Sequence, residues 1–416
     1  MSELKTTRGW QVFDFKRLIV EGLGPAQQPW CGFPEYNFVG GHGDASTLPV
    51  DELIAAVTRA MKREGRDLAT YSLQSGPQGY LPLREYLVNK LERYTGIKCS
   101  VDNIMLTSGS LQGMDLVNSA LLNKGDIVIV EESNYGGALS RFRKLGVEMI
   151  AIPLDSEGMR MDSLENALSE LKDKGLQAKF IYTIPTVHNP TATILSTERR
   201  QQMLKLAAGH NLAIVEDECY ADLVWEGERP PALYATDTDE RVIHIGSFSK
   251  TVAPALRVGY VVAPWAVIAQ LLALKTDAGS GALEQMMLAE FCPDNFDKHL
   301  HNLNKELRQK LDTLVAALDR EFGTSINYSY PPGGIFLWVT FPDGVNTTEL
   351  CAAANKAGVA INPGQEWSLE DGADKSMRLC FAHPDHAQLD AGVTELAKVC
   401  HAQFGIPEFG ANKART

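Results

Sequence analysis

Short, nearly continuous runs of apolar residues alternate with longer amphipathic stretches through the middle of the chain. The clearest runs lie at residues 126–133, 148–154, 178–185, 212–220, 241–249 and 259–264. Runs of this length are typical of strands that helices cover on both faces. Helical patterns separate several of them, for example at residues 196–210, where Ser196 is a good N-cap. The alternation predicts an α/β domain with a mostly parallel sheet.

The pattern changes after about residue 290. A long, charged helical pattern runs from Asp297 to about Phe322, and shorter strand and helix patterns follow it up to about residue 404. This part of the chain is typical of a compact α+β unit. A chain of 416 residues is long enough for one large domain and one smaller one. We therefore expect an N-terminal segment at 1–45, a large domain at 46–295 and a small C-terminal domain at 296–416.

The composition, with 44% apolar and 22% charged residues, is that of an ordinary globular enzyme. The net charge of −13 argues against a surface for nucleic acid or anionic lipid, because both need clustered Lys and Arg. No apolar run approaches the ~20 residues of a membrane span. The first fifteen residues lack the apolar core of a secretory signal. The seven cysteines are scattered and contain no C-x-x-C pair, so we expect a cytoplasmic protein without disulfides or a metal site.

Polar residues follow several of the predicted strands, at the edge where open α/β sheets bind ligands. Asn189 comes after one strand, Asp217 and Tyr220 lie at the end of the next, and Ser247, Ser249 and Lys250 follow a third. Arg257 comes seven residues after Lys250. Earlier in the chain, residues 108–110 (Ser-Gly-Ser) lead directly into a helical pattern. Hydroxyl groups and backbone N–H groups at a helix N-terminus favour an anion.

Lys250 by itself is equally typical of a solvated loop after a strand. Together, however, the residues offer a lysine amine, a phosphate site, a buried carboxylate and an Asn/Tyr pair, which are the groups that pyridoxal phosphate needs. The lysine forms the Schiff base, and the aspartate pairs with the pyridinium nitrogen. Donors to the ring 3-oxygen tune the imine, and hydroxyls with an arginine neutralise the phosphate.

The stretch SFSKTVAPALRVGY at residues 247–260 is similar to the cofactor-lysine motif of the fold-type I pyridoxal phosphate enzymes. The chain resembles the class I/II aminotransferases from about residue 37 to 400. The nearest branch is that of the 2-aminoadipate and kynurenine aminotransferases, which also supplies the enzyme-like domain of MocR-type regulators. The resemblance implies a large domain with a mostly parallel sheet, a smaller α+β domain and a homodimer with shared active sites.

The resemblance also implies roles for individual residues, beginning with Lys250, Asp217 and Tyr135 as the catalytic set. Tyr135 is expected to stack on the cofactor ring, and Tyr71 to reach the phosphate of the neighbouring subunit. The full set of expected cofactor contacts is Ser110, the Leu111 amide, Tyr135, Asn189, Asp217, Tyr220, Ser247, Ser249, Lys250, Arg257 and Tyr71.

The substrate side of the site follows from the same resemblance. Arg378 is expected to hold the substrate α-carboxylate bidentately, with Asn189 beside it, and the glycines at 40 and 41 to lie over the substrate. His42 and Arg17 are polar residues where this branch covers the substrate, so we interpret Gly41, His42 and Arg17 as substrate contacts. For His42 and Arg17, an ordinary loop histidine and a surface arginine remain the alternatives.

The sequence thus predicts an amino acid transaminase with 2-oxoglutarate as the expected acceptor. Two alternatives remain open at this point. A pyridoxal phosphate lyase or decarboxylase would use nearly the same site residues. A MocR-type ligand-binding regulator would carry a basic DNA-binding domain, which the first forty residues are too short to form and which the acidic composition disfavours. The amino donor is not predicted.

Overall fold

The computed structural model describes residues 13–20 and 26–408, and the chain divides into two units, Met1–Phe33 and Pro34–Thr416. The first unit contains the short 3-10 helix η1 (Phe15–Leu18), which begins after Asp14. The Asp14 side chain caps it by accepting a hydrogen bond from the backbone N–H of Lys16 at 3.0 Å. Arg17 lies in this helix and is exposed. Most of the stretch searched for a secretory signal lies outside the described residues.

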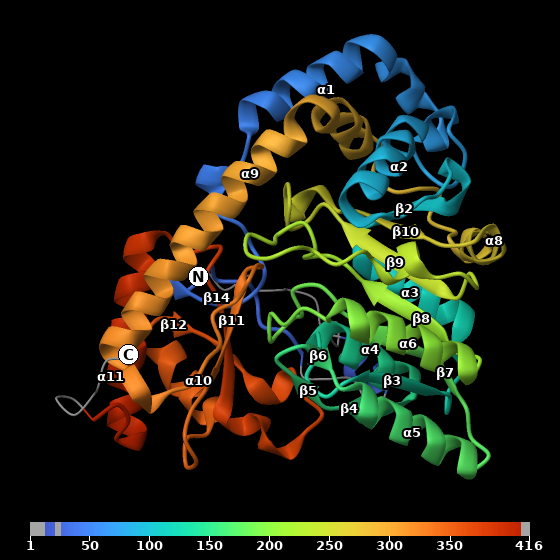
Figure 1. The fold of residues 1–416 in the computed structure, drawn as a ribbon. Coiled ribbons are helices and arrows are strands. Elements are labelled where there is room, and N and C mark those ends of the chain that lie inside the picture. The colour runs from blue at the N-terminus through green and yellow to red at the C-terminus, as the bar shows by residue number, and fades with distance from the viewer. Residues whose placement is uncertain (1–12, 21–25, 409–416) are drawn as a thin grey trace. The chain divides into compact units, whose positions relative to one another are not determined.

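The second unit is built on a seven-stranded sheet flanked by helices (Figure 1). The strand order is β2 (Ile104–Ser108), β10 (Val258–Val262), β9 (Val242–Ser247), β8 (Ala213–Asp217), β7 (Ala178–Thr183), β3 (Ile127–Glu131) and β4 (Glu148–Ile152). Strand β10 is antiparallel to both of its neighbours, and the other pairs are parallel. The predicted mostly parallel sheet is therefore confirmed, and the reversal at β10 was not predicted.

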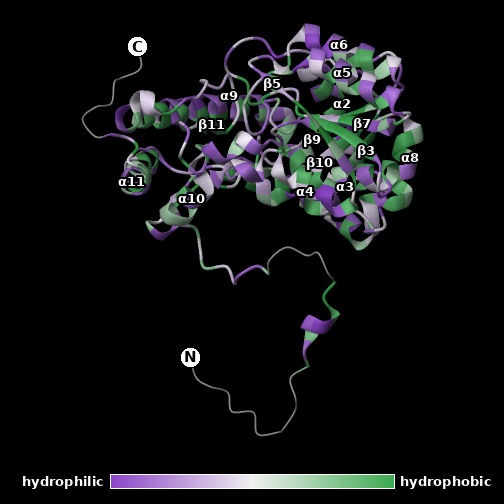
Figure 2. Cartoon of the chain, turned by 90° about the horizontal axis from the view of Figure 1, so that it is seen from below, coloured by the Kyte–Doolittle hydropathy of each residue, from purple (hydrophilic) through white to green (hydrophobic). Residues whose placement is uncertain are grey.

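Both faces of the sheet are apolar. Successive side chains of a strand point to opposite faces, so a continuous apolar run places apolar side chains on both of them. Ile127 and Ile129 of β3 belong to one buried cluster, and Val128 and Val130 belong to the other. In Figure 2 the strands β7 and β9 are mainly hydrophobic, whereas the surrounding helices carry both kinds of residue. Burial on both faces explains why the strands read as continuous apolar runs in the sequence.

Helices connect the strands and cover the sheet. Helix α3 packs on β2, β9 and β10 and against α8, and α5 packs on α6 and β4. The helices of this part are α1 (Val50–Glu64), α2 (Leu81–Thr95), α3 (Ser110–Leu121), α4 (Gly136–Leu145), α5 (Met161–Asp173), α6 (Thr197–Gly209), α7 (Leu233–Thr236) and α8 (Trp265–Leu274). A two-stranded ribbon, β5 (Leu154–Asp155) with β6 (Gly158–Met159), precedes α5. Ser196 caps α6 as predicted, accepting from the Arg199 N–H.

The C-terminal part is built around a three-stranded antiparallel sheet. Its strands are β11 (Phe336–Thr340), β14 (Ser376–Cys380) and β13 (Asn362–Pro363), in that order. The helices α10 (Thr347–Lys356) and α11 (His386–Phe404) belong to this part, where β1 (Tyr36–Asn37) pairs in parallel with β12 (Val359–Ala360). The α+β character predicted for this region matches these elements.

Helix α9 (Ala282–Glu321) joins the two parts without a break, and it begins earlier than the predicted start at Asp297. Pro293 lies inside the helix, although a proline normally interrupts one. Tertiary packing overrides this signal, since Leu288, Phe291 and Cys292 before and beside the proline are buried. The predicted domain boundary at 295/296 falls inside this helix, and the division into a large and a small domain stays a prediction.

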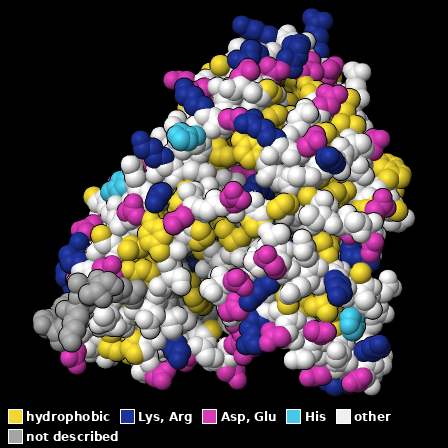
Figure 3. Space-filling view, viewed as in Figure 1, with side chains coloured by type: hydrophobic (Ala, Val, Ile, Leu, Met, Phe, Trp, Pro, Cys, Tyr) yellow, Lys and Arg dark blue, Asp and Glu magenta, His cyan; other side chains and the backbone are white. Residues whose placement is uncertain are grey.

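Acidic and basic side chains are interspersed on the face drawn in Figure 3, where they separate the apolar residues. None of the helices in the described part of the chain is both long and apolar enough to cross a membrane. The described residues also contain no group of three or more His, Cys, Asp or Glu side chains arranged to hold a metal ion.

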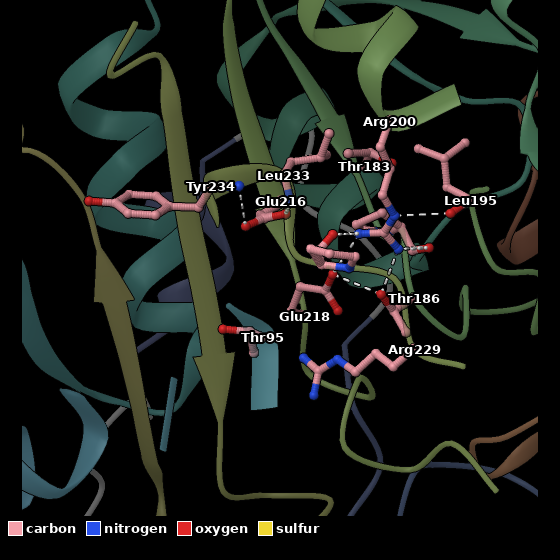
Figure 4. A network of polar contacts seen from close by, with 12 residues as sticks. Thr95, Thr183, Thr186, Leu195, Arg200, Glu216, Glu218, Arg229, Leu233 and Tyr234 are labelled. Atoms are coloured by element: carbon pink, nitrogen blue, oxygen red, sulfur yellow. Dashed lines mark hydrogen bonds and ion pairs between the residues drawn. The ribbon is translucent and has the colours of Figure 1, made fainter. Parts of the chain in front are cut away.

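A buried arginine of α6 fixes the loop at residues 185–195, which follows β7 and carries Asn189 (Figure 4). The Arg200 guanidinium donates to the carbonyl oxygens of Pro185 at 2.8 Å and Leu195 at 2.9 Å. It also donates to the Thr186 hydroxyl at 2.8 Å. Both ends of the loop are therefore attached to one side chain.

The same guanidinium reaches the strand end that carries Asp217. Arg200 Nη1 lies 3.5 Å from Glu218 Oε1, which also accepts from the Thr186 hydroxyl at 2.8 Å. Both side chains of the ion pair are at most 2% exposed. Because the pair is buried, removing one partner would leave an uncompensated charge in the interior.

We expect Arg200→Met to lower the free energy of unfolding by about 3–5 kcal/mol, because Glu218 would lose its partner in the interior. Urea unfolding of the cofactor-loaded protein at fixed protein concentration measures the change. The matched control is Arg320→Met, since Arg320 pairs with Asp390 where both side chains are about half exposed, 48% and 52%. The control should lose less than about 1 kcal/mol. Equal losses in the two variants would contradict this assignment.

Candidate active site

A cavity of about 340 Å³ lies where the C-terminal ends of β7, β8 and β9 approach the start of α3 and strand β14. Thirteen of the residues expected at the site line it. They are Gly40, Gly41, Ser110, Leu111, Tyr135, Asn189, Asp217, Tyr220, Ser247, Ser249, Lys250, Arg257 and Arg378. The chain brings them together from segments more than three hundred residues apart in sequence, so the cavity is a property of the fold.

Lys250 lies just after β9, and its amine faces the glycine segment at residues 40–41. Lys250 Nζ donates to the Gly41 carbonyl oxygen at 2.7 Å. A side chain at position 41 would collide with it, because a Cβ there would lie 2.5 Å from Nζ. Burial lowers the pKa of Lys250, and the positive charges of Arg378 and Arg257 act in the same direction. The amine is therefore biased toward its neutral, nucleophilic form.

One end of the cavity gathers hydrogen-bond donors. Helix α3 begins at Ser110 after Gly109, which provides no side-chain cap, so the first N–H groups of the helix lack a capping side chain. The Arg257 guanidinium lies so close to Gly109 that a Cβ there would be 2.1 Å from Nη2. Arg257 Nη1 also lies 3.5 Å from the Ser249 hydroxyl. A helix N-terminus, hydroxyl groups and an arginine together suit a phosphate.

Asp217 ends β8 and is fully buried at the cavity. It accepts hydrogen bonds from the Tyr182 hydroxyl at 2.9 Å and from the Cys219 N–H at 3.3 Å. Burial raises the pKa of Asp217, and these two hydrogen bonds oppose the rise. A carboxyl group in this environment gains most from a cationic partner, and no described residue forms an ion pair with it.

A line of side chains connects Tyr220 to Arg378. The Asn189 amide donates to the Tyr220 hydroxyl at 3.1 Å, and Arg378 Nη1 donates to Asn189 Oδ1 at 3.0 Å. Arg378 Nη2 donates to Asn362 Oδ1 at 2.7 Å and to the Gly40 carbonyl oxygen at 3.1 Å. The orientation of the guanidinium is thereby fixed from both ends.

Two aromatic rings enclose the same guanidinium. Arg378 Cζ lies 3.8 Å from the centre of the Phe336 ring and 3.6 Å from that of the Trp367 ring. Burial lowers the pKa of Arg378 to about 10. Within the described residues, no carboxylate comes within ion-pair distance of this guanidinium. A buried cation without a protein counter-charge is a strong binding point for an anionic ligand group.

Three of the expected contacts lie outside the lining of the cavity. Tyr71 is 84% exposed, in the 3-10 helix η4 (Tyr71–Gln74). His42 folds over Gly40, and its ring lies 5.7 Å from that of His383. Burial lowers the pKa of His42. Arg17 belongs to the first unit. The roles of these three residues stay predictions.

The structure adds lining residues that the sequence did not single out, namely Phe336, Asn362 and Trp367. Asn362 pairs directly with Arg378 across β13 and β14, and Phe336 lies one diagonal away on β11. No local motif marks these residues. Strand register, which the sequence alone does not specify, brings Phe336 and Asn362 to Arg378, and Trp367 comes from the turn after the 3-10 helix η8 (Gly364–Glu366).

The profile of the family "Aminotransferase class I and II" matches residues 41–396. The aromatic-amino-acid aminotransferase 1 of Thermococcus litoralis is 33% identical over 87% of this chain and 87% of its own length. The 2-aminoadipate transaminase of Thermus thermophilus is 30% identical over 87% of this chain and 89% of its own. The kynurenine aminotransferase structure of Pyrococcus horikoshii matches with a TM-score of 0.83, at 33% identity over 88% of this chain and 91% of that one.

Regulators containing a related domain also match. One HTH-type transcriptional regulator of Bacillus subtilis is 31% identical over 82% of this chain and 70% of its own length. The fold, the gathered site residues and the relatives named as transaminases agree, and the predicted family, fold and cofactor are confirmed. The chain belongs to the class I and II aminotransferases and is a pyridoxal phosphate-dependent transaminase of amino acids.

Proposed function

We propose that this transaminase holds its cofactor on Lys250 and its amino acid substrate on Arg378. One observation carries the proposal: two basic side chains with lowered pKa values line the same cavity, and the described part of the chain places no carboxylate in ion-pair distance of Arg378. An amino acid carries a carboxylate for the arginine and an amino group for the chemistry at the lysine. 2-Oxoglutarate, the proposed acceptor, also presents an α-carboxylate.

The residues of the cavity fit pyridoxal phosphate. The phosphate would lie against Ser110, the Leu111 amide, Ser247, Ser249 and Arg257. A Cβ at Gly109 or Gly259 would intrude on this group of donors, which indicates close packing around it. At the opposite side, the buried carboxyl of Asp217 would pair with the ring nitrogen. When bound, pyridoxal phosphate supplies an aldehyde carbon that reacts with amines and a ring that withdraws electrons from the substrate.

Lys250 then serves as a base. Because burial lowers its pKa, the amine has a larger neutral fraction at neutral pH and can remove the proton from the substrate Cα. Asp217 would keep the ring nitrogen protonated, because a buried carboxylate stabilises a cationic neighbour. The hydroxyl of Tyr220 and the amide of Asn189 would donate to the ring 3-oxygen, and Tyr135 would stack on the ring.

Arg378 would set the orientation of the substrate. Its guanidinium is held flat between two rings and bonded at both terminal nitrogens, so little freedom remains to be lost when it binds a carboxylate. A fixed carboxylate keeps the substrate Cα in one orientation, which selective proton removal requires. We also propose that Gly41, His42 and Arg17 contact the rest of the substrate.

A homodimer with shared sites is the proposed assembly. Tyr71 is exposed, and Val50, Ile54 and Met61 on one side of α1 are 43–56% exposed. The three residues after Tyr71 have φ values of 62°, 48° and 56°, a left-handed backbone that non-glycine residues adopt only when surrounding contacts hold it. An apolar surface and a constrained loop both support a second copy of the chain as the partner. The cytoplasm is the proposed location.

The function is tested by mixing the cofactor-loaded protein with 2-oxoglutarate and amino acids, including aromatic ones, 2-aminoadipate and kynurenine. Glutamate should form with at least one donor. Lys250→Ala should lower this rate at least about a thousandfold while still binding the cofactor through the phosphate residues. Lys375→Ala, at an exposed lysine paired with Asp343, is the control and should change nothing.

Two further measurements on the cofactor-loaded protein test the assignment. Borohydride treatment should attach the cofactor covalently to Lys250, as peptide mass spectrometry would show, and attachment to another lysine would overturn the assignment. Release of ammonia without any 2-oxo acid would favour a lyase.

We expect Arg378→Lys to raise KM for the amino acid about ten- to a hundredfold, with a smaller change in kcat. The lysine keeps the charge and one hydrogen bond to the carboxylate but loses the second, parallel bond of the guanidinium, a charge-assisted bond being worth about 1.5–3 kcal/mol. Steady-state kinetics measure the split, and the visible spectrum of the bound cofactor should stay unchanged. An unchanged KM would place the carboxylate elsewhere.

The shared site is tested by complementation. Protomers carrying Lys250→Ala and protomers carrying Tyr71→Phe are mixed to form heterodimers, in which one of the two sites carries neither change. About half of the wild-type activity should return in these heterodimers, because a C2 dimer has two equivalent sites. Sedimentation at micromolar concentration supplies the second measurement, and a monomer there would rule out the proposal.

A further inference from the structure

Glu131, the last residue of β3, connects two segments that line the cavity. It is 2% exposed. Its Oε1 accepts hydrogen bonds from the Thr183 hydroxyl at 2.5 Å and from the Ile184 N–H at 3.2 Å, at the end of β7. Its Oε2 accepts from the side-chain amide of Asn134 at 2.5 Å. Ile184 lines the cavity, so Glu131 anchors one of its walls.

Asn134 passes this contact on to the start of α4. The residue is fully buried, and its Oδ1 accepts from the backbone N–H of Tyr135 at 2.6 Å. The backbone N–H of Asn134 donates to the carbonyl oxygen of Trp367 at 2.7 Å. The side-chain amide has one oxygen and one nitrogen, and each has a partner. Glu131 needs the nitrogen as a donor, so the oxygen must face Tyr135.

Tyr135 and Trp367 in turn form part of the cavity wall. Their ring centres lie 5.9 Å apart, and Trp367 covers one face of the Arg378 guanidinium. The orientation of one buried carboxyl group thus determines the placement of the aromatic residue proposed to stack on the cofactor. It also supports the ring that encloses the proposed substrate arginine.

The hydrogen bonds, rather than a charge, carry the effect. Burial raises the pKa of Glu131 to about 7, the bonds from Thr183 and Ile184 oppose the rise, and Asp217 adds to it. A group that titrates near neutrality in a buried setting gives little net charge stabilisation. Its two oxygens nevertheless face three donors, which specifies the orientation of every neighbour.

We propose that Glu131 and Asn134 are positioning residues of the transaminase, which set the orientation of Tyr135 over the cofactor and of Trp367 against Arg378. The inference rests on the proposed function, because it assigns to Tyr135 and Arg378 the roles given there. Neither Glu131 nor Asn134 lines the cavity. They act through their neighbours and not by contact with the ligand.

An exchange of polarity tests the pair. Glu131→Gln presents an NH2 group to the NH2 group of Asn134, and Asn134→Asp presents a carboxylate to a carboxylate. Both single changes remove a hydrogen bond and leave buried groups unpaired. The double variant restores the bond, because the new amide at position 131 can donate to the new carboxylate at position 134. The amide oxygen at 131 still accepts from Thr183 and Ile184, and the carboxylate at 134 keeps its second oxygen for the Tyr135 N–H.

We expect each single variant to lower kcat/KM about ten- to a hundredfold, the loss that one unpaired buried group produces. The visible circular dichroism of the bound cofactor should change in both, and the cofactor dissociation constant should rise. In the double variant all three quantities should return to within about threefold of wild type. Glu132→Gln is the matched control, since Gln keeps the oxygen that accepts from the Leu154 N–H, and it should behave as wild type.

The outcomes separate cleanly. A double variant as impaired as the worse single variant, or single variants with wild-type dichroism and kinetics, would overturn the inference. If a single variant does not fold, the double variant still decides, because recovery of folding without recovery of the dichroism also contradicts the proposal. A wild-type protein that transaminates no amino acid would instead overturn the proposed function, whatever the variants do.

Discussion

The structure depends on two basic side chains, Lys250 and Arg378, that line one cavity. Desolvation lowers the pKa of both, and the charge of Arg378 lowers that of Lys250 further. The chain supports them with backbone carbonyl oxygens of the 40–41 glycine segment, with amide oxygens and with aromatic faces, all of which are weaker than a carboxylate. The protein alone compensates the positive charge of such a cavity poorly. In the proposed function, the phosphate of the cofactor and the carboxylate of the substrate balance this charge when they bind. In the proposed function, a preference for anionic ligand groups follows from the absence of a carboxylate within ion-pair distance of Arg378 among the described residues.

The residues that line such a cavity must be held in place by their neighbours. Three consecutive carboxyl groups at the end of β8 illustrate how this is achieved. Glu216 accepts from the backbone N–H groups of Leu233 and Tyr234 at the start of α7, and its other contact is the His244 ring at 2.8 Å. Asp217 faces the cavity, and Glu218 pairs with Arg200. The contacts of Glu216 and Glu218 fix the end of the strand from two sides. They therefore hold Asp217, which lies between them, in position at the cavity. A sequence of three acids would ordinarily indicate solvent, whereas here all three are buried.

How far the sequence predicts this arrangement depends on whether a residue acts locally or across the fold. The strands could be predicted because strands that are buried on both faces consist of continuous apolar runs. The cluster around Lys250 could be predicted because the residues of one motif are neighbours in the chain. The reversed strand β10 could not, since its run looks the same in either direction. Phe336 was missed because β-sheet register brings it to Arg378, and Trp367 because it comes to Arg378 from a turn after η8 that carries no motif. Glu131 was missed for another reason. Two glutamates are adjacent at 131 and 132, and the sequence does not indicate that Glu131 is buried and accepts hydrogen bonds from three donors. The start of α9 was predicted too late because the charged pattern begins only at Asp297, whereas buried residues such as Leu288 and Phe291 extend the helix back to Ala282.

Helix α9 has a mechanical consequence. At 1.5 Å per residue its 40 residues form a rod of about 60 Å, long for a globular protein. The first half contacts α1 through Arg59 and Glu290, and the last turns contact α11 through Arg320 and Asp390, so one long helix contacts helices of both parts. Pro293 lacks the N–H that would bond to the carbonyl of residue 289, which makes that turn the softest point of the rod. Bending would concentrate there, and the later turns would move together with the segment after β14, because Lys310 of α9 donates to the carbonyl oxygens of Ala382 and Pro384.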